Sequence, residues 1–523
     1  MSRKWWTLLT VSVGTFMLLL DITVVNTALP SIQKDLSAGF TDVQWVIDAY
    51  TLALAATVLT AGSLADRLGR RAVFTVGLAI FSLASLAAGL APDATFLNVA
   101  RAVQGIGGAA MFAVSLALVA QEFAPGRERA TAMGIYGATI GVSVAVGPLV
   151  GGAITSGLGW RWVFFVNVPV GAAAIALTLA QVRESRDPNA TRVDWAGLVT
   201  FSTALFLLVL ALLRGNDEGW GSPLIVSLFA GAGLMLAAFA AIEQRVAEPM
   251  LPLHLFRRGA FTGVQLAAAA VSASLFALFL YLTLYLQNYL GYSPLQAGLR
   301  YLPITLVPFL VAPLAVALMG RVHARVLMAV SLALIGGGLL LMSGLTPSDG
   351  WTALLPGFIV AGIGVGLLNP VIADVAVSVV PKERSGMAAG INDTFRQVGV
   401  AVGVAAWGAV FLGRGADKIS TLVSGTPAAS GGHPRQLLEA ATDGRLGSAL
   451  SGLPVQARTL VAHATREGFL SGMNSILVIG SVVAFAGAAL ALWLVREREI
   501  EREQPDEVEL VTPLEEQFAA IAA

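Results

Sequence analysis

The chain has no cysteine, which excludes disulfides, iron–sulfur clusters and thiol catalysis. Charge is also scarce: Asp, Glu, Lys and Arg make up 12% of the 523 residues, too few to cover a soluble globule of this size. The net charge is zero, so there is no electrostatic basis for a nucleic-acid partner. The histidines show no metal-ligand spacing, and we expect no metal site from His254, His323, His433 and His463.

Motifs of membrane enzymes and of nucleotide-driven pumps are missing too. The sequence contains no Gly-x-Ser-x-Gly nucleophile, no His-Glu-x-x-His pair and no Gly-x-x-x-x-Gly-Lys-Ser/Thr loop. We therefore predict that the protein is not an enzyme and needs no cofactor. A receptor or scaffold that transports nothing stays an alternative.

Long apolar segments dominate what is present, since 56% of residues are hydrophobic and the mean hydropathy is +0.78. About 20 apolar residues in a helix cross the roughly 30 Å of hydrocarbon in a bilayer. Fourteen segments reach about this length and predict an all-α polytopic membrane protein surrounded by lipid. They are 6–29, 43–64, 72–90, 96–120, 132–156, 163–182, 195–213, 224–242, 261–289, 297–319, 326–345, 354–375, 387–412 and 472–495.

An even number of spans places both ends of the chain on one side. Basic residues gather in the short loops of that side, for example Arg127, Arg129, Arg257 and Arg258. Because cytoplasmic loops carry the excess of Lys and Arg, we expect both termini in the cytoplasm. Abundant Arg, Ala and Gly suggest a GC-rich genome, so the expected location is a bacterial cytoplasmic (inner) membrane.

An internal repeat divides the chain into two related halves. Pro125 matches Pro381 at an offset of 256 residues, and 144–147 matches 400–403 at the same offset. Equivalent spans in the same orientation imply parallel repeats with the substrate near the midplane between them. The predicted units are an N-terminal six-helix bundle, two inserted spans, a C-terminal six-helix bundle with a long solvated loop, and a cytoplasmic tail, over 1–190, 191–255, 256–495 (loop 413–469) and 496–523. We expect a functional monomer.

The first span contains an acid, Asp21, that cannot face lipid at its depth. Counting 1.5 Å per residue places Asp21, Asp48 and Arg101 in one layer, about 5–10 Å below the outer surface. The Arg101 guanidinium favours ionised Asp21 whereas burial favours the neutral acid, so the pair is suited to proton coupling. The alternative is a permanent ion pair that only holds two helices together. We expect Asp48 at the membrane interface, as a secondary charge site.

Other polar and aromatic residues are candidates for further sites. Asp393 and Arg396 stand three apart on one helix face, and we expect them to neutralise each other. Asp374 is expected at a gate or interface near the cytoplasmic end of its span. Candidates for lining a substrate cavity, with packing or lipid contact as the alternative, are Phe16, Met17, Asn26, Gln104, Tyr136, Phe276, Tyr281, Tyr285 and Asn392.

Two glycine-rich stretches are expected to control helix movement. In the loop 62–71, glycines permit a tight turn and charged groups anchor it, which makes gating candidates of Gly62, Asp66, Arg67, Gly69 and Arg70. In the fifth span, small residues allow close helix contact and a proline bends the helix, which makes hinge candidates of Gly141, Gly147, Pro148 and Gly151. Ordinary tight packing is the alternative for the second set.

The loop 62–71 closely resembles the signature loop of the major facilitator superfamily. Residues 20–30 resemble the first-helix motif of its fourteen-helix drug:proton antiporter branch, and 101–108 resemble the fourth-helix motif with its buried Arg. Residues 141–152 are similar to the fifth-helix antiporter motif, and 160–169 to a segment typical of this branch.

The resemblance implies two six-helix bundles plus two extra spans, and proton-driven efflux of hydrophobic or cationic drugs or antibiotics. A lipid or glycolipid exporter and a proton-coupled symporter are alternatives on the same scaffold. The fifth-helix motif argues against symport.

Overall fold

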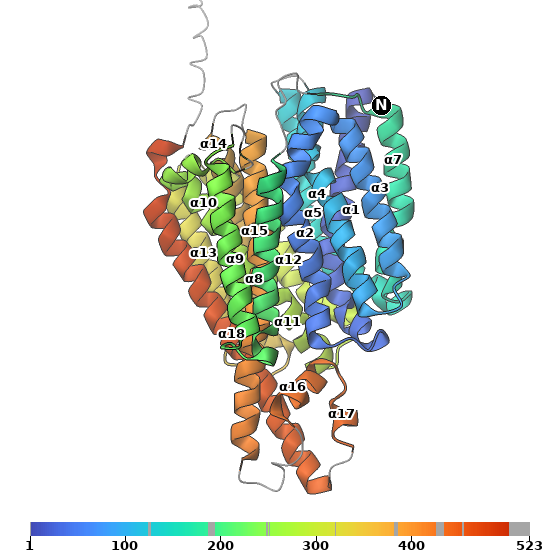
Figure 1. The fold of residues 1–523 in the computed structure, drawn as a ribbon, viewed down its shortest axis with the longest axis vertical. Helices are drawn as coiled ribbons and strands as arrows, with labels where there is room; N and C mark the ends of the chain where they lie inside the picture. The colour runs from blue at the N-terminus through green and yellow to red at the C-terminus, as the bar shows by residue number, and fades with distance from the viewer. Residues whose placement is uncertain are drawn as a thin grey trace, which may run out of the picture.

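The computed structural model describes residues 2–500 with short gaps. The gaps are 124–126, 187–193, 247–248, 250, 320, 381–384, 425–432 and 452–453. The predicted tail beyond residue 500 and the side chain of Asp66 also lie outside the described residues. The described part is almost entirely helical (Figure 1).

The helices are named in chain order (Figure 1). The N-terminal half consists of α1 (Arg3–Asp35), α2 (Phe40–Leu68), α3 (Arg70–Gly89), α4 (Ala94–Glu122), α5 (Arg127–Gly157), α6 (Arg161–Phe165) and α7 (Asn167–Gln181). The inserted pair is α8 (Trp195–Glu218) and α9 (Pro223–Glu243). The C-terminal half consists of α10 (Gly259–Ser274), α11 (Phe279–Leu284), α12 (Pro294–Leu318), α13 (Ala324–Met342), α14 (Leu355–Ser378), α15 (Ser385–Val423), α16 (Pro434–Thr442), α17 (Leu446–Ala449) and α18 (Val455–Leu494).

The N-terminus and the end of α18 lie at the same end of the molecule, which we call the terminus face (Figure 1). Helices α16 and α17 project from the other end, which we call the opposite face (Figure 1).

Twelve helices in the described part are long and apolar enough to cross a membrane, and the bent helix α5 makes thirteen. The bend is 44° between Ile135–Ser143 and Ala145–Gly157. The break is at residue 144, four residues before Pro148, because the ring of a proline clashes with the carbonyl group at that position of a helix. Helix α2 has 29 residues but includes side chains outside the described part, and the total of fourteen stays a prediction.

The inserted pair lies along the boundary between the two halves. Leu205 and Val209 of α8 form an apolar cluster with Leu52 of α2 and with Ala401 and Ala405 of α15. Helix α8 therefore packs on both halves at once. The outer sides of α8 and α9 leave large apolar side chains exposed, as expected for contact with lipid, among them Val199, Phe206, Val226 and Leu234.

The segment predicted as the long solvated loop 413–469 is mostly helical. Helix α15 continues to Val423 and α18 begins at Val455, well beyond the predicted ends of those spans. Between them, α16 buries Leu437 and Leu438. Helix α16 packs its apolar side chains against the ends of the long helices, and the solvated cap stays a prediction for the rest of the segment.

The turn between α2 and α3 depends on Gly69. Its φ is +117°, and a Cβ at this position would lie 2.5 Å from the carboxyl group of Glu184. That carboxylate accepts hydrogen bonds from the backbone N–H groups of Arg71 (3.0 Å) and Ala72 (3.2 Å). A negative charge at the first turn of a helix satisfies free N–H groups and complements the helix dipole. Gly69 thus leaves room for the Glu184 carboxylate, from the end of the N-terminal half, to cap helix α3.

We predict that Gly69→Ala lowers the stability of the folded protein by about 1–3 kcal/mol, through backbone strain and displacement of Glu184. Thermal unfolding of the purified protein in detergent measures the change. Gly62→Ala is the matched control, because the nearest atom to a Cβ there, Ala113 Cβ, is 3.9 Å away. Equal melting temperatures for the two variants would contradict the prediction.

Candidate functional site

The structure brings Asp21 of α1 and Arg101 of α4 together inside the N-terminal half. Arg101 Nη1 lies 2.5 Å from Asp21 Oδ2, and each residue is 2% exposed. A buried ion pair is stable only if further hydrogen bonds satisfy the groups that it takes out of water. Both partners have such bonds.

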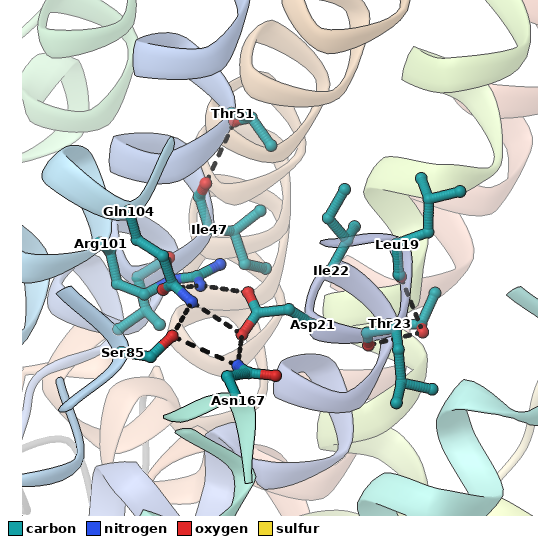
Figure 2. Close-up of polar contacts among 12 residues, drawn as sticks. Leu19, Asp21, Ile22, Thr23, Ile47, Thr51, Ser85, Arg101, Gln104 and Asn167 are labelled. Atoms are coloured by element: carbon teal, nitrogen blue, oxygen red, sulfur yellow. Dashed lines mark hydrogen bonds and ion pairs between the residues drawn. The ribbon is translucent and has the colours of Figure 1, made fainter. Parts of the chain in front are cut away.

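Amide side chains complete the shell around the Asp21 carboxylate (Figure 2). Gln104 Nε2 and Asn167 Nδ2 each donate to Asp21 Oδ1 at 3.0 Å. Ser85 Oγ accepts from the same two amides, at 2.6 Å and 3.3 Å. The carboxylate thus accepts three hydrogen bonds from side chains, which satisfy both of its oxygens.

The guanidinium of Arg101 is held equally firmly. Its Nη1 donates to Gln104 Oε1 at 2.6 Å and its Nε donates to the carbonyl of Val46 on α2 at 3.1 Å. The ring of Tyr50, also on α2, lies 4.2 Å from the guanidinium carbon, a cation–π distance. Arg101 therefore ties together α1, α2 and α4.

Glycines of α4 make this arrangement possible. A Cβ on Gly105 would lie 2.4 Å from the carbonyl oxygen of Tyr50, and a Cβ on Gly107 would lie 2.5 Å from the backbone nitrogen of Phe81. Helix α4 consequently packs directly on the backbones of α2 and α3, which lets the adjacent Arg101 reach across to α1.

Two members of this network, Ser85 and Asn167, did not emerge from the sequence analysis. Asn167 falls within the family-like segment 160–169, and an amide at that depth is the signal that could have identified it. Gln104 was a candidate for the substrate cavity, whereas the structure places it in the ion-pair network.

The expectation that Asp48 lies at the membrane interface is wrong. The residue is 0% exposed, and neither carboxylate oxygen has a hydrogen-bond partner among the described residues. Arg101 bonds α2 at Val46, which precedes Asp48 by two residues and lies about 200° from it around the helix axis. Arg101 therefore contacts the side of α2 that faces away from Asp48.

Close to Asp48, hydrogen bonds join the two halves. Gln44 Nε2 of α2 donates to Tyr281 Oη and to the Val404 carbonyl, both at 3.0 Å, and Tyr281 Oη donates to the same carbonyl at 2.6 Å. The rings of Phe40, Tyr281 and Phe411 pack beside them, with centroids 5.7–6.1 Å apart. We call these five residues, Phe40, Gln44, Tyr281, Val404 and Phe411, the seal.

The described hydrogen bonds between the halves all lie toward the opposite face. Besides those of the seal, Gln287 Nε2 donates to the Thr27 carbonyl at 2.8 Å and the Leu295 N–H donates to Ser156 Oγ at 3.0 Å. The molecule is therefore closed at the opposite face in this structure.

A further contact connects this closed end to α16. Gln33 Nε2, at the end of α1, donates to Asp443 Oδ1 at 2.5 Å, and Arg445 forms an ion pair with the same Asp443 carboxylate. Burial raises the pKa of the Asp443 carboxyl, and the Arg445 guanidinium opposes this by lowering the pKa. The α15–α18 extension therefore holds the end of the N-terminal half.

We predict that fixing this contact blocks the working cycle. In a Gln33→Cys, Asp443→Cys variant, a short bifunctional thiol reagent should stop transport of a fluorescent substrate, and a reductant should restore it. The absence of natural cysteines makes the labelling specific. Each single-cysteine variant, treated with the same reagent, is the control. Undiminished transport by the bridged protein would show that the two ends need not separate.

In the C-terminal half, Asp393 and Arg396 interact electrostatically, and the expectation that they neutralise each other stays a prediction. No ion pair within 4.0 Å joins them in the described part of the chain. Arg396 instead donates to the side-chain oxygens of Asn392 (3.3 Å) and Asn369 (3.1 Å). Asn392 in turn donates to Gln265 Oε1 at 2.9 Å. One amide on its own helix, Asn392, and one on α14, Asn369, thus accept the hydrogen bonds of the cation.

The remaining cavity candidates do not meet in one place. Met17 and Tyr136 are buried in the N-terminal core, Tyr281 is in the seal, and Tyr285 stacks on Tyr289 at 5.3 Å. Asn26 donates to the Ile22 carbonyl of its own helix at 3.0 Å. The cavity candidates Phe16 and Phe276 are half-buried. Asp374, which was expected at a gate or interface, is half-buried near the terminus-face end of α14.

The hinge candidates of α5 lie in its contacts with α1. A Cβ on Gly147 would lie 1.8 Å from Thr23 Oγ1, and one on Gly151 would lie 2.7 Å from the Val24 carbonyl oxygen. Gly141 has only an ordinary contact, with Phe309 at 3.6 Å. On the loop 62–71, Arg67 is exposed and the Arg70 N–H donates to the Ser185 carbonyl at 2.9 Å.

The described residues contain no group of three or more His, Cys, Asp or Glu that could hold a metal ion. Two helical halves that meet at a polar seal, with a buried ion pair inside one of them, are the architecture of a membrane transporter.

The chain belongs to the Major Facilitator Superfamily, whose family model matches residues 11–404. It is 34% identical over 509 residues to the tetracenomycin C resistance and export protein of Streptomyces glaucescens, covering 97% of this chain and 94% of that protein. It is 40% identical over 420 residues to the puromycin resistance protein pur8 of Streptomyces alboniger, covering 79% and 82%. It is 38% identical over 407 residues to the multidrug resistance protein Stp of Mycobacterium tuberculosis, covering 77% and 75%.

Among solved structures, the fold is similar to a bacterial homologue of the human lysosomal transporter Spinster in an inward-facing, occupied conformation. The TM-score is 0.62 at 18% identity, covering 95% of this chain and 98% of that chain. The similarity concerns the fold alone.

Proposed function

We propose that this protein exports lipophilic or cationic small molecules, including antibiotics, from a bacterial cell in exchange for protons. The observation that carries the proposal is the Asp21–Arg101 pair, an ionisable pair sealed within apolar spans. Such groups are costly to bury and usually mark ion or substrate pathways. The names of the relatives, which include resistance and export proteins, support the substrate class.

In this proposal the terminus face is cytoplasmic, in line with the basic loops near it. The closed opposite face then corresponds to a state that accepts substrate from inside the cell, and opening of the seal releases it outside. All members of the Asp21 network belong to the N-terminal half, so simple rocking of the two halves leaves the pair intact. Coupling through Asp21 therefore requires α1 to shift relative to α4 within that half.

The test uses everted membrane vesicles with an acidic lumen and a panel of fluorescent dyes. Adding a transported dye should raise the lumenal pH, because protons leave as the dye enters, and an uncoupler should abolish dye accumulation. Asp21→Asn should lose the proton response. Dye export that is insensitive to the uncoupler would overturn proton coupling, and an Asp21→Asn variant that retains the wild-type proton response would remove Asp21 from the mechanism.

A further inference from the structure

The most unusual charge in the described part of the molecule is Asp48. Within one layer of the N-terminal half there are two acids and one guanidinium. Asp21 takes the guanidinium and three hydrogen bonds, whereas Asp48 is fully buried and both of its oxygens lack partners. Burying an unpaired carboxylate is so costly that such a group takes up a proton instead.

Helix geometry shows which way Asp48 faces. Gln44, one turn earlier on α2, is on the same side of the helix and bonds to Tyr281 and Val404 of the other half. Leu52, one turn later, belongs to the apolar cluster with Ala401 of α15. Asp48 therefore lies at the boundary between the halves, directly behind the seal.

Among the residues that the structure describes, none provides a countercharge next to Asp48. On α2 its neighbour is the neutral Gln44, on α11 it is the phenol of Tyr281, and α15 and α8 contribute apolar side chains. Arg101 and Asp21 lie on the other side of α2 and bind each other. A negative charge at Asp48 is therefore incompatible with a closed seal, whereas a neutral carboxyl can be buried at much lower cost.

We propose that Asp48 carries the transported proton: it is protonated whenever the seal is closed, and losing the proton opens the seal. This inference rests on the proposed function and assigns its coupling step to a particular group. With the seal open, the carboxylate faces water at the opposite face and binds H⁺ from it. The neutral acid then permits closure.

To complete the cycle, substrate binds from the terminus face and the Asp48 proton is released to water on that same face. The carboxylate left behind destabilises the seal, the opposite face opens, and the substrate leaves. One proton enters from the opposite-face medium and leaves to the terminus-face medium, in the direction that antiport requires. The Asp21–Arg101 pair holds α2 in place through the Val46 carbonyl. Loss of the proton response in Asp21→Asn would then follow from displacement of α2 and of Asp48 on it.

The experiment measures opening of the seal directly. Spin labels at Lys34→Cys and Ser348→Cys, both exposed at the opposite face, report the distance between the halves in proteoliposomes across a pH series. In the labelled protein with Asp48 intact, the ratio of open to closed molecules should rise by about tenfold per pH unit through the transition. With Asp48→Asn, which imitates the protonated acid, the short distance should persist at every pH.

Asp42→Asn is the matched control. Asp42 is another acid of α2, but its carboxylate accepts from the Gly39 N–H at the start of the helix, so the pH response should stay as in the wild type. Asp48→Glu should recover a pH response and thereby show that Asp48→Asn is folded but fixed in one state.

The outcomes separate the two proposals. If wild-type dye export is sensitive to an uncoupler and Asp48→Asn opens with pH as the wild type does, the role of Asp48 is overturned and proton-coupled export stands. If wild-type export ignores the uncoupler, the proposed function fails. Both proposals are supported if wild-type export is sensitive to the uncoupler, and if Asp48→Asn neither exports dye nor opens at the opposite face.

Discussion

Arg101→Ala is expected to abolish export and to destabilise the protein by about 3–5 kcal/mol, since it leaves a buried carboxylate without its cation. Asp21 would retain hydrogen bonds from Gln104 and Asn167, but two neutral amides do not replace a guanidinium at 2.5 Å. Thermal unfolding in detergent and dye export from cells measure the two effects. Arg101→Lys, which keeps the charge but cannot bond Val46 and Gln104 at once, should lie between wild type and Arg101→Ala.

Asp21→Asn is also expected to destabilise the protein, because it leaves a buried guanidinium that cannot lose its charge. Arg101 would keep two acceptors, the Gln104 side chain and the Val46 carbonyl, and its contact with the ring of Tyr50. In the double variant Asp21→Asn, Arg101→Ala no charge remains buried in this network, and most of the stability should return. Its export activity distinguishes the two roles of the pair: continued loss indicates a role in transport, and recovery would mean that the pair only holds α1 to α4.

The sequence was sufficient to predict the overall class of fold and the meeting of Asp21 with Arg101. Helical rise is constant, so counting residues from the span ends correctly placed Asp21 and Arg101 at one level. Counting does not determine the rotation of each helix. Asp48 is near the same level but on the far side of α2, and only the packing of α2 against the C-terminal half shows that it is buried without a partner.

Contacts between distant segments were beyond prediction for the same physical reason. The i, i+3 spacing of Asp393 and Arg396 permits an ion pair, yet Asn369 from another helix provides the better-placed acceptor. Glu184, which caps α3, stands 113 residues from the N–H group it binds. Local sequence patterns predict which segments are helical and how far apart side chains lie along a helix. Tertiary packing decides which of several possible partners a charged side chain binds.

Two adjacent glycines of α5 allow contacts within the N-terminal half to be tested separately from contacts between the two halves. A Cβ on Gly151 would lie 2.3 Å from Thr27 Oγ1 and 2.7 Å from the Val24 carbonyl oxygen of α1, in the same half. A Cβ on Gly152 would lie 2.4 Å from the Pro294 carbonyl oxygen of α12, in the other half. Adjacent glycines thus make two close contacts with different consequences.

We expect Gly151→Ala to lower stability by about 1–3 kcal/mol in every state, because α1 and α5 stay packed throughout the cycle. Gly152→Ala should leave the fold intact but weaken the closed opposite face, which at about 1–3 kcal/mol is a shift of roughly 5- to 150-fold toward the open state. Melting temperature measures the first effect and spin-label distance the second. Gly137→Ala is the control, because nothing lies within 4 Å of a Cβ there. If Gly152→Ala lowers the melting temperature without changing the distance, then α5 and α12 do not separate when the seal opens, and the movement must occur between α2 and α15.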